Sequence, residues 1–311
     1  MSLLSSKATL IFPGQGSQYV GMGKDLPRDY FDRAGQRLGL DLATLCREGP
    51  LEKLVLTPYT QPAILTHSVA LLERVRPLLA SKGISIARVM GHSVGEYAAL
   101  VCAGAMSFED AVWSTHLRGK FMQEAVPPGE GGMAAVLKLD FCTVAETCRQ
   151  VDREGERVGV ANFNSPEQVV ISGHLKALDK VARALGEKAK GKRFRVIPLP
   201  VSAPFHGPLM ALAAERLAEH FRRISFRPPE LPYVANIDGR EYPAGTPGDV
   251  VKQNLIRQIE GSVQWMTGTK ALEENPLVFE IGPGRVLSAL VKKCRPDATC
   301  YSLDGDLSPL L

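Results

Sequence analysis

The most constraining feature of this sequence is a serine held between two glycines, directly after an apolar run. Residues 84–90 are expected to form a strand, Gly91-His92-Ser93-Val94-Gly95 follows, and an apolar, alanine-rich helix is expected over residues 96–105. Strand, tight turn and helix in this order form a nucleophile elbow, which exposes a serine hydroxyl at a strained turn. The helix N-terminus would also stabilise negative charge that develops at Ser93. An ordinary helix start capped by Ser93 is the alternative, but the flanking elements favour a nucleophile.

Cues for helices and strands alternate along the 311 residues, which indicates an α/β fold. The clearest interruption is Pro127-Pro128-Gly129-Glu130-Gly131-Gly132, a turn-rich segment. After it the sequence predicts strand, helix, strand, strand, helix and strand, at residues 133–137, 141–153, 158–161, 168–172, 175–188 and 193–198. This βαββαβ order is that of a ferredoxin-like unit. We therefore predict a large hydrolase-like core with a mostly parallel sheet, formed by residues 1–127 and 199–311, and an inserted ferredoxin-like subdomain at residues 128–198.

Three further elements are predicted in the core: a strand at residues 8–12 and helices at residues 40–47 and 108–123. Another helix is expected over residues 63–76, with Pro62 in its first turn, where proline is tolerated. The tail from Asp304 onwards is expected to be frayed.

Charge and cysteine content exclude several classes of protein. The 37 basic and 33 acidic residues give a net charge of only +4, whereas a nucleic-acid-binding protein usually carries a stronger basic stripe. The six cysteines form no CxxC pair and no zinc-site spacing, so we expect no metal and reduced thiols in a cytoplasmic protein. The N-terminus lacks an apolar signal core and no apolar run reaches the length of a membrane span, so no membrane association is expected.

A serine hydroxyl needs a neighbouring base to act as a nucleophile. His206 is the best candidate among six histidines, because it lies in a loop just after a predicted strand and follows Ser93 in chain order, as in α/β-hydrolases. A structural loop histidine is the alternative. His92 is expected to point away from the serine. The remaining histidines are expected at the surface or at helix caps: His67, His116, His174 and His220.

The loop Pro13-Gly14-Gln15-Gly16-Ser17-Gln18 fits neither common phosphate-binding motif. A dinucleotide fingerprint would need glycine at Tyr19, and a P-loop would need serine or threonine at Asp25. An oxyanion hole remains, in which glycines let backbone N–H groups approach a reacting carbonyl. A plain glycine turn is the alternative.

Together these segments resemble the malonyl-CoA:acyl carrier protein transacylase family, which includes the acyltransferase domains of fatty-acid and polyketide synthases. The matching segments span nearly the whole chain: Phe12-Pro13-Gly14-Gln15-Gly16-Ser17-Gln18, Thr60-Gln61-Pro62-Ala63, Gly91-His92-Ser93-Val94-Gly95-Glu96-Tyr97, Arg118-Gly119-Lys120-Phe121-Met122-Gln123, Gly132-Met133-Ala134-Ala135-Val136, Asn162-Phe163-Asn164-Ser165-Pro166, Ser202-Ala203-Pro204-Phe205-His206 and Glu280-Ile281-Gly282-Pro283-Gly284. The resemblance implies the same fold as the pattern does, a hydrolase-like core with an inserted ferredoxin-like subdomain.

The resemblance implies that Ser93 is the nucleophile and His206 the general base. In this family a backbone carbonyl, rather than a carboxylate, orients the histidine. Gln258, ahead of Trp265, matches that position, although Gln253 and Asn254 lie close to it in sequence.

Other site residues follow from the same resemblance. The N–H groups of Gln15 and Val94 correspond to the oxyanion donors, and Gln61 corresponds to a pocket position near the substrate. Asn162 and His92 are also placed beside the substrate by their segments.

Arg118 and Phe205 bear on which acyl group is selected. A guanidinium can hold the free carboxylate of malonyl through two parallel hydrogen bonds, and burying it unpaired beside acetyl would be costly. A surface helix arginine is the alternative. Phe205 precedes His206, and in related polyketide acyltransferases phenylalanine at this position accompanies malonyl whereas serine accompanies methylmalonyl. Pocket size discriminates only modestly, by about 1–3 kcal/mol per methylene.

The resemblance implies malonyl-CoA as donor, an acidic acyl carrier protein as acceptor, a monomer and no cofactor, since the coenzyme A thioester is itself a substrate. Two competing functions are a hydrolase on the same elbow and an inactive carrier-binding scaffold. Both the fatty-acid and the polyketide pathway stay open, and the latter includes a trans-acting acyltransferase with another extender unit. One basic cluster could be a solvated turn or a surface for an acidic partner or coenzyme A phosphates: Lys188, Lys190, Lys192, Arg193 and Arg195.

Overall fold

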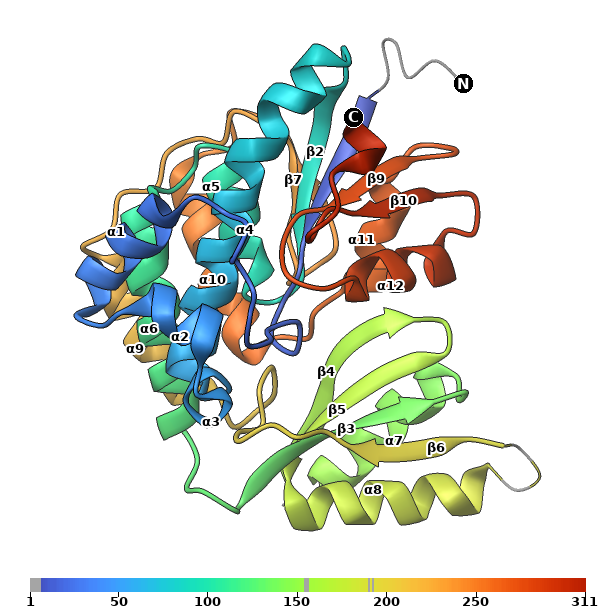
Figure 1. Ribbon diagram of the computed structural model, residues 1–311. Coiled ribbons are helices and arrows are strands. Elements are labelled where there is room, and N and C mark those ends of the chain that lie inside the picture. Colours follow the sequence, from blue (N-terminus) through green and yellow to red (C-terminus); the bar gives the residue numbers. More distant parts are fainter. Residues whose placement is uncertain (1–6, 154–156, 190, 192) are drawn as a thin grey trace.

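The computed structural model describes residues 7–153, 157–189, 191 and 193–311. Its strands form two separate sheets (Figure 1). The larger has the order β10 (Thr299–Ser302), β9 (Leu277–Glu280), β1 (Lys7–Phe12), β2 (Ser85–Gly91), β7 (Tyr233–Val234) and β8 (Glu241–Tyr242). The smaller has the order β4 (Val158–Ser165), β5 (Gln168–His174), β3 (Gly131–Leu137) and β6 (Arg195–Pro198).

The larger sheet is parallel except for its edge strand β8. Strand β1 lies in its middle and is buried on both faces, as expected for a parallel sheet covered by helices. Leu10 and Phe12 pack into the main core, while Ile11 packs into a smaller core beneath α11 and α12. Phe12 pairs with Gly91 at the carboxyl ends of β1 and β2. The loop after β1 and the elbow after β2 therefore meet at one edge of the sheet, where ligands of such folds bind.

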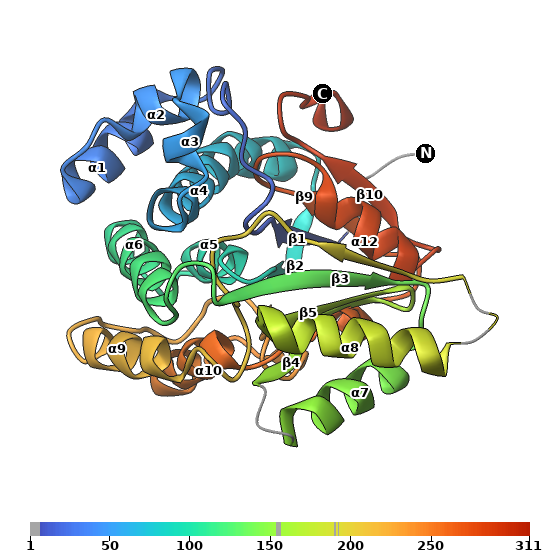
Figure 2. The ribbon, with the colours of Figure 1, turned by 90° about the horizontal axis from the view of Figure 1, so that it is seen from below.

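Helices cover both faces of this sheet (Figures 1 and 2). One group includes the long helix α4, and the other consists of α11 and α12. The helices of the core are α1 (Arg28–Leu38), α2 (Leu42–Glu48), α3 (Leu51–Leu54), α4 (Thr57–Ser81), α5 (Gly95–Cys102), α6 (Phe108–Glu124), α9 (Ala211–Phe221), α10 (Gly248–Glu260), α11 (Trp265–Gly268) and α12 (Val286–Cys294), with the 3₁₀ turns η1 (Thr269–Ala271) and η2 (Ser308–Leu310).

The predicted start of the long helix at Pro62 is wrong, because α4 already begins at Thr57 and carries Pro62 in its interior. A proline inside a helix leaves the carbonyl four residues earlier without its usual donor. That carbonyl belongs to Pro58, and it lies 2.9 Å from Nδ1 of His116, which replaces the missing hydrogen bond. Pro58 occupies the first turn of the helix, the position that the sequence assigned to Pro62.

The smaller sheet confirms the ferredoxin-like topology. Its strands pair antiparallel, β3 with both β5 and β6, and β4 with β5. The helices α7 (Phe141–Arg153) and α8 (Leu175–Lys188) cover one face, away from the larger sheet (Figures 1 and 2). Strand β4 also bonds to the core, since Phe163 N–H donates to Val263 O at 2.9 Å and Val263 N–H to Ala161 O at 2.8 Å. The four strands lie inside residues 128–198, and the subdomain boundaries themselves stay a prediction.

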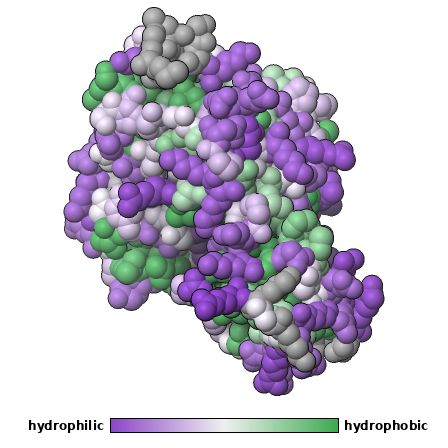
Figure 3. All heavy atoms as spheres, turned by 90° about the vertical axis from the view of Figure 1, so that its right-hand side faces the viewer, coloured by the Kyte–Doolittle hydropathy of each residue, from purple (hydrophilic) through white to green (hydrophobic). Residues whose placement is uncertain are grey.

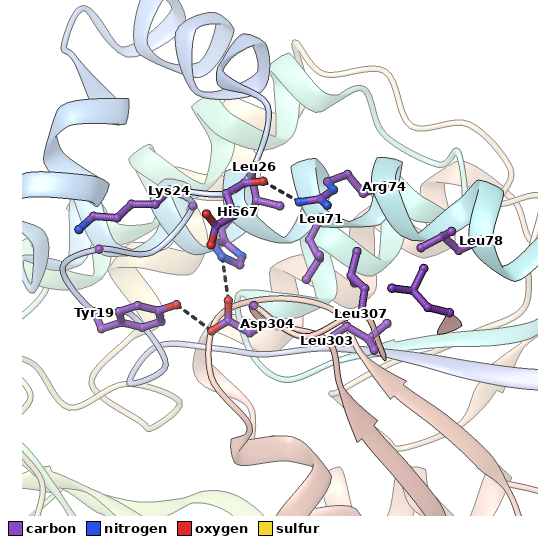
Figure 4. A pocket seen from close by; sticks show the side chains of 15 residues that line it. Tyr19, Lys24, Leu26, His67, Leu71, Arg74, Leu78, Leu303, Asp304 and Leu307 are labelled. Carbon is purple, nitrogen blue, oxygen red and sulfur yellow. Dashed lines mark hydrogen bonds and ion pairs between the residues drawn. The ribbon is translucent and has the colours of Figure 1, made fainter. Parts of the chain in front are cut away.

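The expectation of a frayed tail is wrong. Asp304 lies beside α4, where its carboxylate accepts from Tyr19 Oη at 3.0 Å and lies 3.2 Å from Nε2 of His67 (Figure 4). Its Oδ2 also accepts from Gly284 N–H at 2.7 Å, and Leu310 is buried. The interaction buries His67 as well, which corrects its expected surface position. A cavity of about 480 Å³ remains between α4 and this tail.

The described part of the chain contains no helix that is long and apolar enough to cross a membrane. The face shown in Figure 3 is mostly hydrophilic, with only scattered apolar patches.

Candidate active site

The elbow after β2 forces Ser93 into a strained backbone conformation. Ser93 has a φ of 53°, in the left-handed region that non-glycine residues rarely adopt. A Cβ atom at Gly91 would lie 2.0 Å from the Gly95 carbonyl carbon, and one at Gly95 would lie 2.1 Å from Phe12 O. Both positions therefore require glycine. The N-cap of α5 is Val94, with no side-chain cap hydrogen bond, so Ser93 does not serve as a helix cap.

His206 lies directly against the serine. Its Nε2 is 2.6 Å from Ser93 Oγ, and its Nδ1 is 2.8 Å from the backbone carbonyl of Gln258. The carbonyl can only accept, so Nδ1 carries the hydrogen and Nε2 is left as the acceptor for the serine proton. Burial, followed by the nearby positive charge of Arg118, lowers the pKa of His206, which keeps the ring neutral and able to accept a proton.

Arg118 on α6 reaches the same point from the other side. It is only 2% exposed, so it is not a surface arginine. Its Nη2 donates to Ser93 Oγ at 3.1 Å and to Gln258 Oε1 at 2.9 Å, and its Nη1 donates to Gln61 Oε1 at 2.7 Å. Burial lowers the pKa of Arg118, yet an arginine stays protonated in proteins. The site thus holds a buried cation whose hydrogen-bond partners are all neutral.

Two residues to which sequence reasoning gave no role support the elbow from behind. Asn236, just beyond β7, accepts from Ser93 N–H at 2.6 Å and donates to Gly91 O at 2.6 Å. Glu96 is 1% exposed, and its Oε2 accepts from Asn236 N–H at 3.1 Å and from Gln258 Nε2 at 2.6 Å. The position of Asn236 at a strand end could have indicated its role. It follows β7, which is parallel to β2, and the carboxyl ends of parallel strands lie at the same edge of a sheet.

A cavity of about 510 Å³ opens beside these groups, between the two sheets. It is lined by Gln15, Gly16, Gln18, Val55, Gln61, His92, Ser93, Arg118, Met122, Met133, Asn162, Leu199, Pro200, Val201, Phe205 and His206. Met133 and Asn162 come from the smaller sheet, so both sheets contribute to the walls.

The remaining predicted residues lie at or behind this cavity. Within the described chain, the N–H groups of Gln15 and Val94 have no hydrogen-bond partner, although Val94 itself is buried behind the cavity wall. His92 lines the cavity, with its Nε2 2.9 Å from Asn164 Oδ1 and its ring 5.6 Å from that of Trp265. Burial lowers the pKa of His92 and keeps it neutral.

Among the residues that the structure describes, no group of three or more His, Cys, Asp or Glu side chains could hold a metal ion. The polar groups around Ser93 are instead a neutral imidazole, a guanidinium and amides. This set can accept the serine proton, hold an anion and donate hydrogen bonds to a carbonyl oxygen, which are the requirements of acyl transfer through a serine.

An α/β core with a serine at an elbow and a histidine against it defines an acyl-transferring class of enzyme, and comparison with known proteins agrees. A family model described as "Acyl transferase domain" matches residues 9–299. The malonyl CoA-acyl carrier protein transacylase of Escherichia coli (strain K12) is 43% identical over 302 residues, 94% of either chain. That of Bacillus subtilis (strain 168) is 43% identical over 296 residues, which are 93% of this chain and 90% of the relative.

Solved structures agree over almost the full length. The malonyl CoA-acyl carrier protein transacylase of Coxiella burnetii has a TM-score of 0.88 and 37% identity, covering 97% of this chain and 95% of its own. A malonyl-transacylase in complex with a type II PKS acyl-carrier protein has a TM-score of 0.89 and 38% identity, covering 98% of each chain. The chain belongs to the malonyl-CoA:acyl carrier protein transacylase family of acyltransferases.

Proposed function

We propose that this chain transfers malonyl from malonyl-CoA to the phosphopantetheine thiol of an acyl carrier protein, through an ester on Ser93. One observation carries the proposal: Ser93 Oγ lies 2.6 Å from His206 Nε2 and 3.1 Å from Arg118 Nη2. A base and a carboxylate-binding cation therefore meet at one nucleophile. The names of the relatives, malonyl CoA-acyl carrier protein transacylases, support the same donor and acceptor.

In the first half-reaction, His206 Nε2 accepts the proton of Ser93 Oγ as the oxygen attacks the thioester carbonyl. The N–H groups of Gln15 and Val94 are proposed to donate to the oxyanion, since both lack other partners in the described chain. The C–S bond then breaks, the coenzyme A sulfur takes the proton from His206, and malonyl remains as an ester on Ser93.

In the second half-reaction, the phosphopantetheine thiol takes the place of coenzyme A. His206 Nε2 accepts the thiol proton, and the thiolate attacks the ester carbonyl in the same oxyanion hole. The C–O bond breaks and Ser93 Oγ recovers its proton from His206. The carbonyl of Gln258 orients the ring in both steps and stabilises the imidazolium through Nδ1–H.

Arg118 is proposed to hold the free carboxylate of malonyl. Its guanidinium lies beside the nucleophile, is buried, and has a buried Nε without a partner among the described residues. Phe205, Gln61, Asn162 and His92 line the cavity beside it and would enclose the acyl group. We propose that the Phe205 ring, which lines the cavity, fills the space that an α-methyl group would need and gives a modest preference for malonyl over methylmalonyl.

Arg118 also separates transfer from hydrolysis, the competing function. A hydrolase would release the acyl group to water and has no need of a cation that retains malonyl. We propose that the enzyme acts in the cytoplasm, as a monomer and without a cofactor. The cysteine content supports the location, because six cysteines without a CxxC pair or a zinc-site spacing are typical of reduced thiols in a cytoplasmic protein.

The surface that receives the acidic carrier is proposed to include the basic cluster that runs from the end of α8 to the start of β6. Lys188, Arg193 and Arg195 are exposed there, whereas Lys190 and Lys192 lie outside the described residues. Reversal of charge at Arg193 should slow transfer to the carrier at low salt and leave acylation by malonyl-CoA unchanged, because only the second half-reaction uses this surface. Equal transfer rates at low salt would exclude this surface.

The proposed function is tested by intact mass. Malonyl-CoA should add one malonyl group to the protein, Ser93→Ala should stay unmodified, and a phosphopantetheinylated carrier should then remove the group and gain it. Acetyl-CoA and methylmalonyl-CoA serve as parallel donors. Free malonate without loaded carrier would identify a hydrolase, and no adduct with any donor would refute acyl transfer.

A further inference from the structure

Gln258 contacts both the base His206 and the cation Arg118. Its backbone carbonyl accepts from His206 Nδ1, and its side-chain Oε1 accepts from Arg118 Nη2. Its Nε2 donates to Ser93 O at 3.0 Å and to Glu96 Oε2 at 2.6 Å. The side-chain amide thus bridges Glu96 and Arg118. Its orientation is fixed, because the guanidinium can only donate, to Oε1, and the carboxylate accepts, from Nε2.

Glu96 is incompletely satisfied for a buried carboxyl group. Oε2 accepts two hydrogen bonds, from Asn236 N–H and Gln258 Nε2, while Oε1 is buried with no partner in the described chain. A buried acid kept only for structure would be expected to satisfy both oxygens, as Glu280 does by accepting from Leu287 N–H and Ser288 N–H. Burying Oε1 of Glu96 without a partner among the described residues therefore costs folding free energy, which indicates a functional role for this residue.

The charges around Glu96 point to Arg118. The charged and titratable groups facing Glu96 are Arg118 on α6, Asp238 beyond β7, Tyr233 on β7 and Tyr97 on its own helix. Arg118 alone is cationic. It has no ion pair with any described carboxylate, so Glu96 balances its charge from one amide away and leaves the guanidinium available to a substrate.

We propose that Glu96 is a positioning residue for substrate selection: through the Gln258 amide it holds Arg118 beside Ser93, and it takes up a proton when a substrate carboxylate occupies Arg118. This inference rests on the proposed function. Two anions cannot share one buried cation without cost, so each weakens the other. By linkage, the carboxylate of malonyl favours protonated Glu96, and ionised Glu96 weakens malonyl binding.

The ionisation of Glu96 falls in an accessible pH range. Burial raises the pKa of Glu96 to about 7 in the free protein, opposed by its hydrogen bonds from Gln258 and Asn236 and by Arg118. Neutralising Arg118 with a substrate carboxylate removes the last of these and raises the pKa further. Uptake should therefore be positive near pH 7, at most about half a proton at pH 7, and should vanish well below pH 7, where Glu96 is already protonated in the free protein. Acetyl has no carboxylate and should cause none.

Calorimetric titration in buffers of different ionisation enthalpy measures this uptake. Ser93→Ala prevents acylation, and the difference between malonyl-CoA and acetyl-CoA cancels protons taken up by coenzyme A itself. Ser93→Ala should show the excess uptake with malonyl-CoA, and Ser93→Ala with Glu96→Gln should show almost none. The matched control is Glu280→Gln, another buried glutamate with a raised pKa, which should leave the difference intact.

Steady-state kinetics give a second readout. In the unmodified enzyme KM for malonyl-CoA should rise up to about tenfold between pH 6 and pH 8, and in Glu96→Gln it should stay flat, whereas KM for acetyl-CoA should show no such rise in either protein. If Gln at position 96 prevents folding, Glu96→Asp withdraws the carboxylate from Gln258 and should shift the pH midpoint of uptake.

The outcomes separate this inference from the proposed function. Equal uptake with and without Glu96, no excess uptake with malonyl-CoA, or an unshifted midpoint in Glu96→Asp would overturn the role of Glu96. If Ser93→Ala binds acetyl-CoA as tightly as malonyl-CoA, selection by Arg118 fails instead, and with it the malonyl specificity on which the inference rests.

Discussion

Removing the charge of Arg118 should lower kcat/KM for malonyl-CoA much more than kcat/KM for acetyl-CoA. Arg118→Met keeps the apolar stem and deletes the guanidinium. A hydrogen bond to a charged group contributes about 1.5–3 kcal/mol, so two bonds to the malonyl carboxylate contribute about 3–6 kcal/mol. At about 1.4 kcal/mol per factor of ten, kcat/KM for malonyl-CoA should fall by about 10²–10⁴. Acetyl-CoA meets no unpaired cation in the variant, so it should lose far less or gain.

The assay is the ratio of kcat/KM for malonyl-CoA and acetyl-CoA, because Arg118 also donates to Ser93 Oγ and its loss can slow both donors. Arg222→Met is the matched control, since the Arg222 side chain is 77% exposed and pairs with Glu219 three residues earlier on the surface. Thermal unfolding checks that the amides of Gln61 and Gln258, left without their donor, do not unfold the variant. An equal loss for both donors would refute carboxylate selection and leave Arg118 as a partner of the serine alone.

Three further changes test the rest of the site. Burial and Arg118 lower the pKa of His206. In rapid-mixing assays, the rate of acylation by acetyl-CoA should therefore fall only below the ordinary histidine pKa of about 6.5. A rate that already falls at or above that pH would contradict a neutral buried base. Asn236→Ala removes both elbow hydrogen bonds and should lower kcat for both donors by a similar factor, whereas a changed malonyl-to-acetyl ratio would place Asn236 in substrate selection instead. Gly95→Ala places a methyl group 2.1 Å from Phe12 O, so the variant should lose several kcal/mol of unfolding free energy in denaturant titration, and a wild-type midpoint would show that the elbow can relax.

Much of the site could be predicted because its signals are local. The elbow requires a strand, glycines at positions 91 and 95 and a following helix, all within about twenty residues, and the structure has each of them. The βαββαβ order could likewise be followed from punctuation and periodicity, and both α7 and α8 have the predicted bounds. Secondary structure and tight turns can be predicted from consecutive residues, because backbone conformation depends mostly on near neighbours in the sequence.

The errors arose where two local signals compete or where a distant partner decides. Pro58 and Pro62 both fit a first helical turn, and inside α4 His116 from another helix supplies the hydrogen bond to Pro58 O that Pro62 cannot donate. The tail looked frayed by composition, yet Asp304 finds partners in Tyr19 and His67, far away in the chain. Such pairings depend on how elements pack and leave no periodic trace in the sequence.

The sequence by itself determined the family and the order of the elements and predicted Ser93 as the nucleophile, because each depends on residues that stand together. Only the tertiary structure decided how the site works. It brings Gln258 to His206 and Arg118, and Asn236 to Ser93 across 143 positions of chain, and it places Glu96 behind them as a buried acid. The physical reason is that hydrogen bonding and charge balance in a buried site depend on distance in space, which packing of the two sheets and their helices sets and sequence spacing does not.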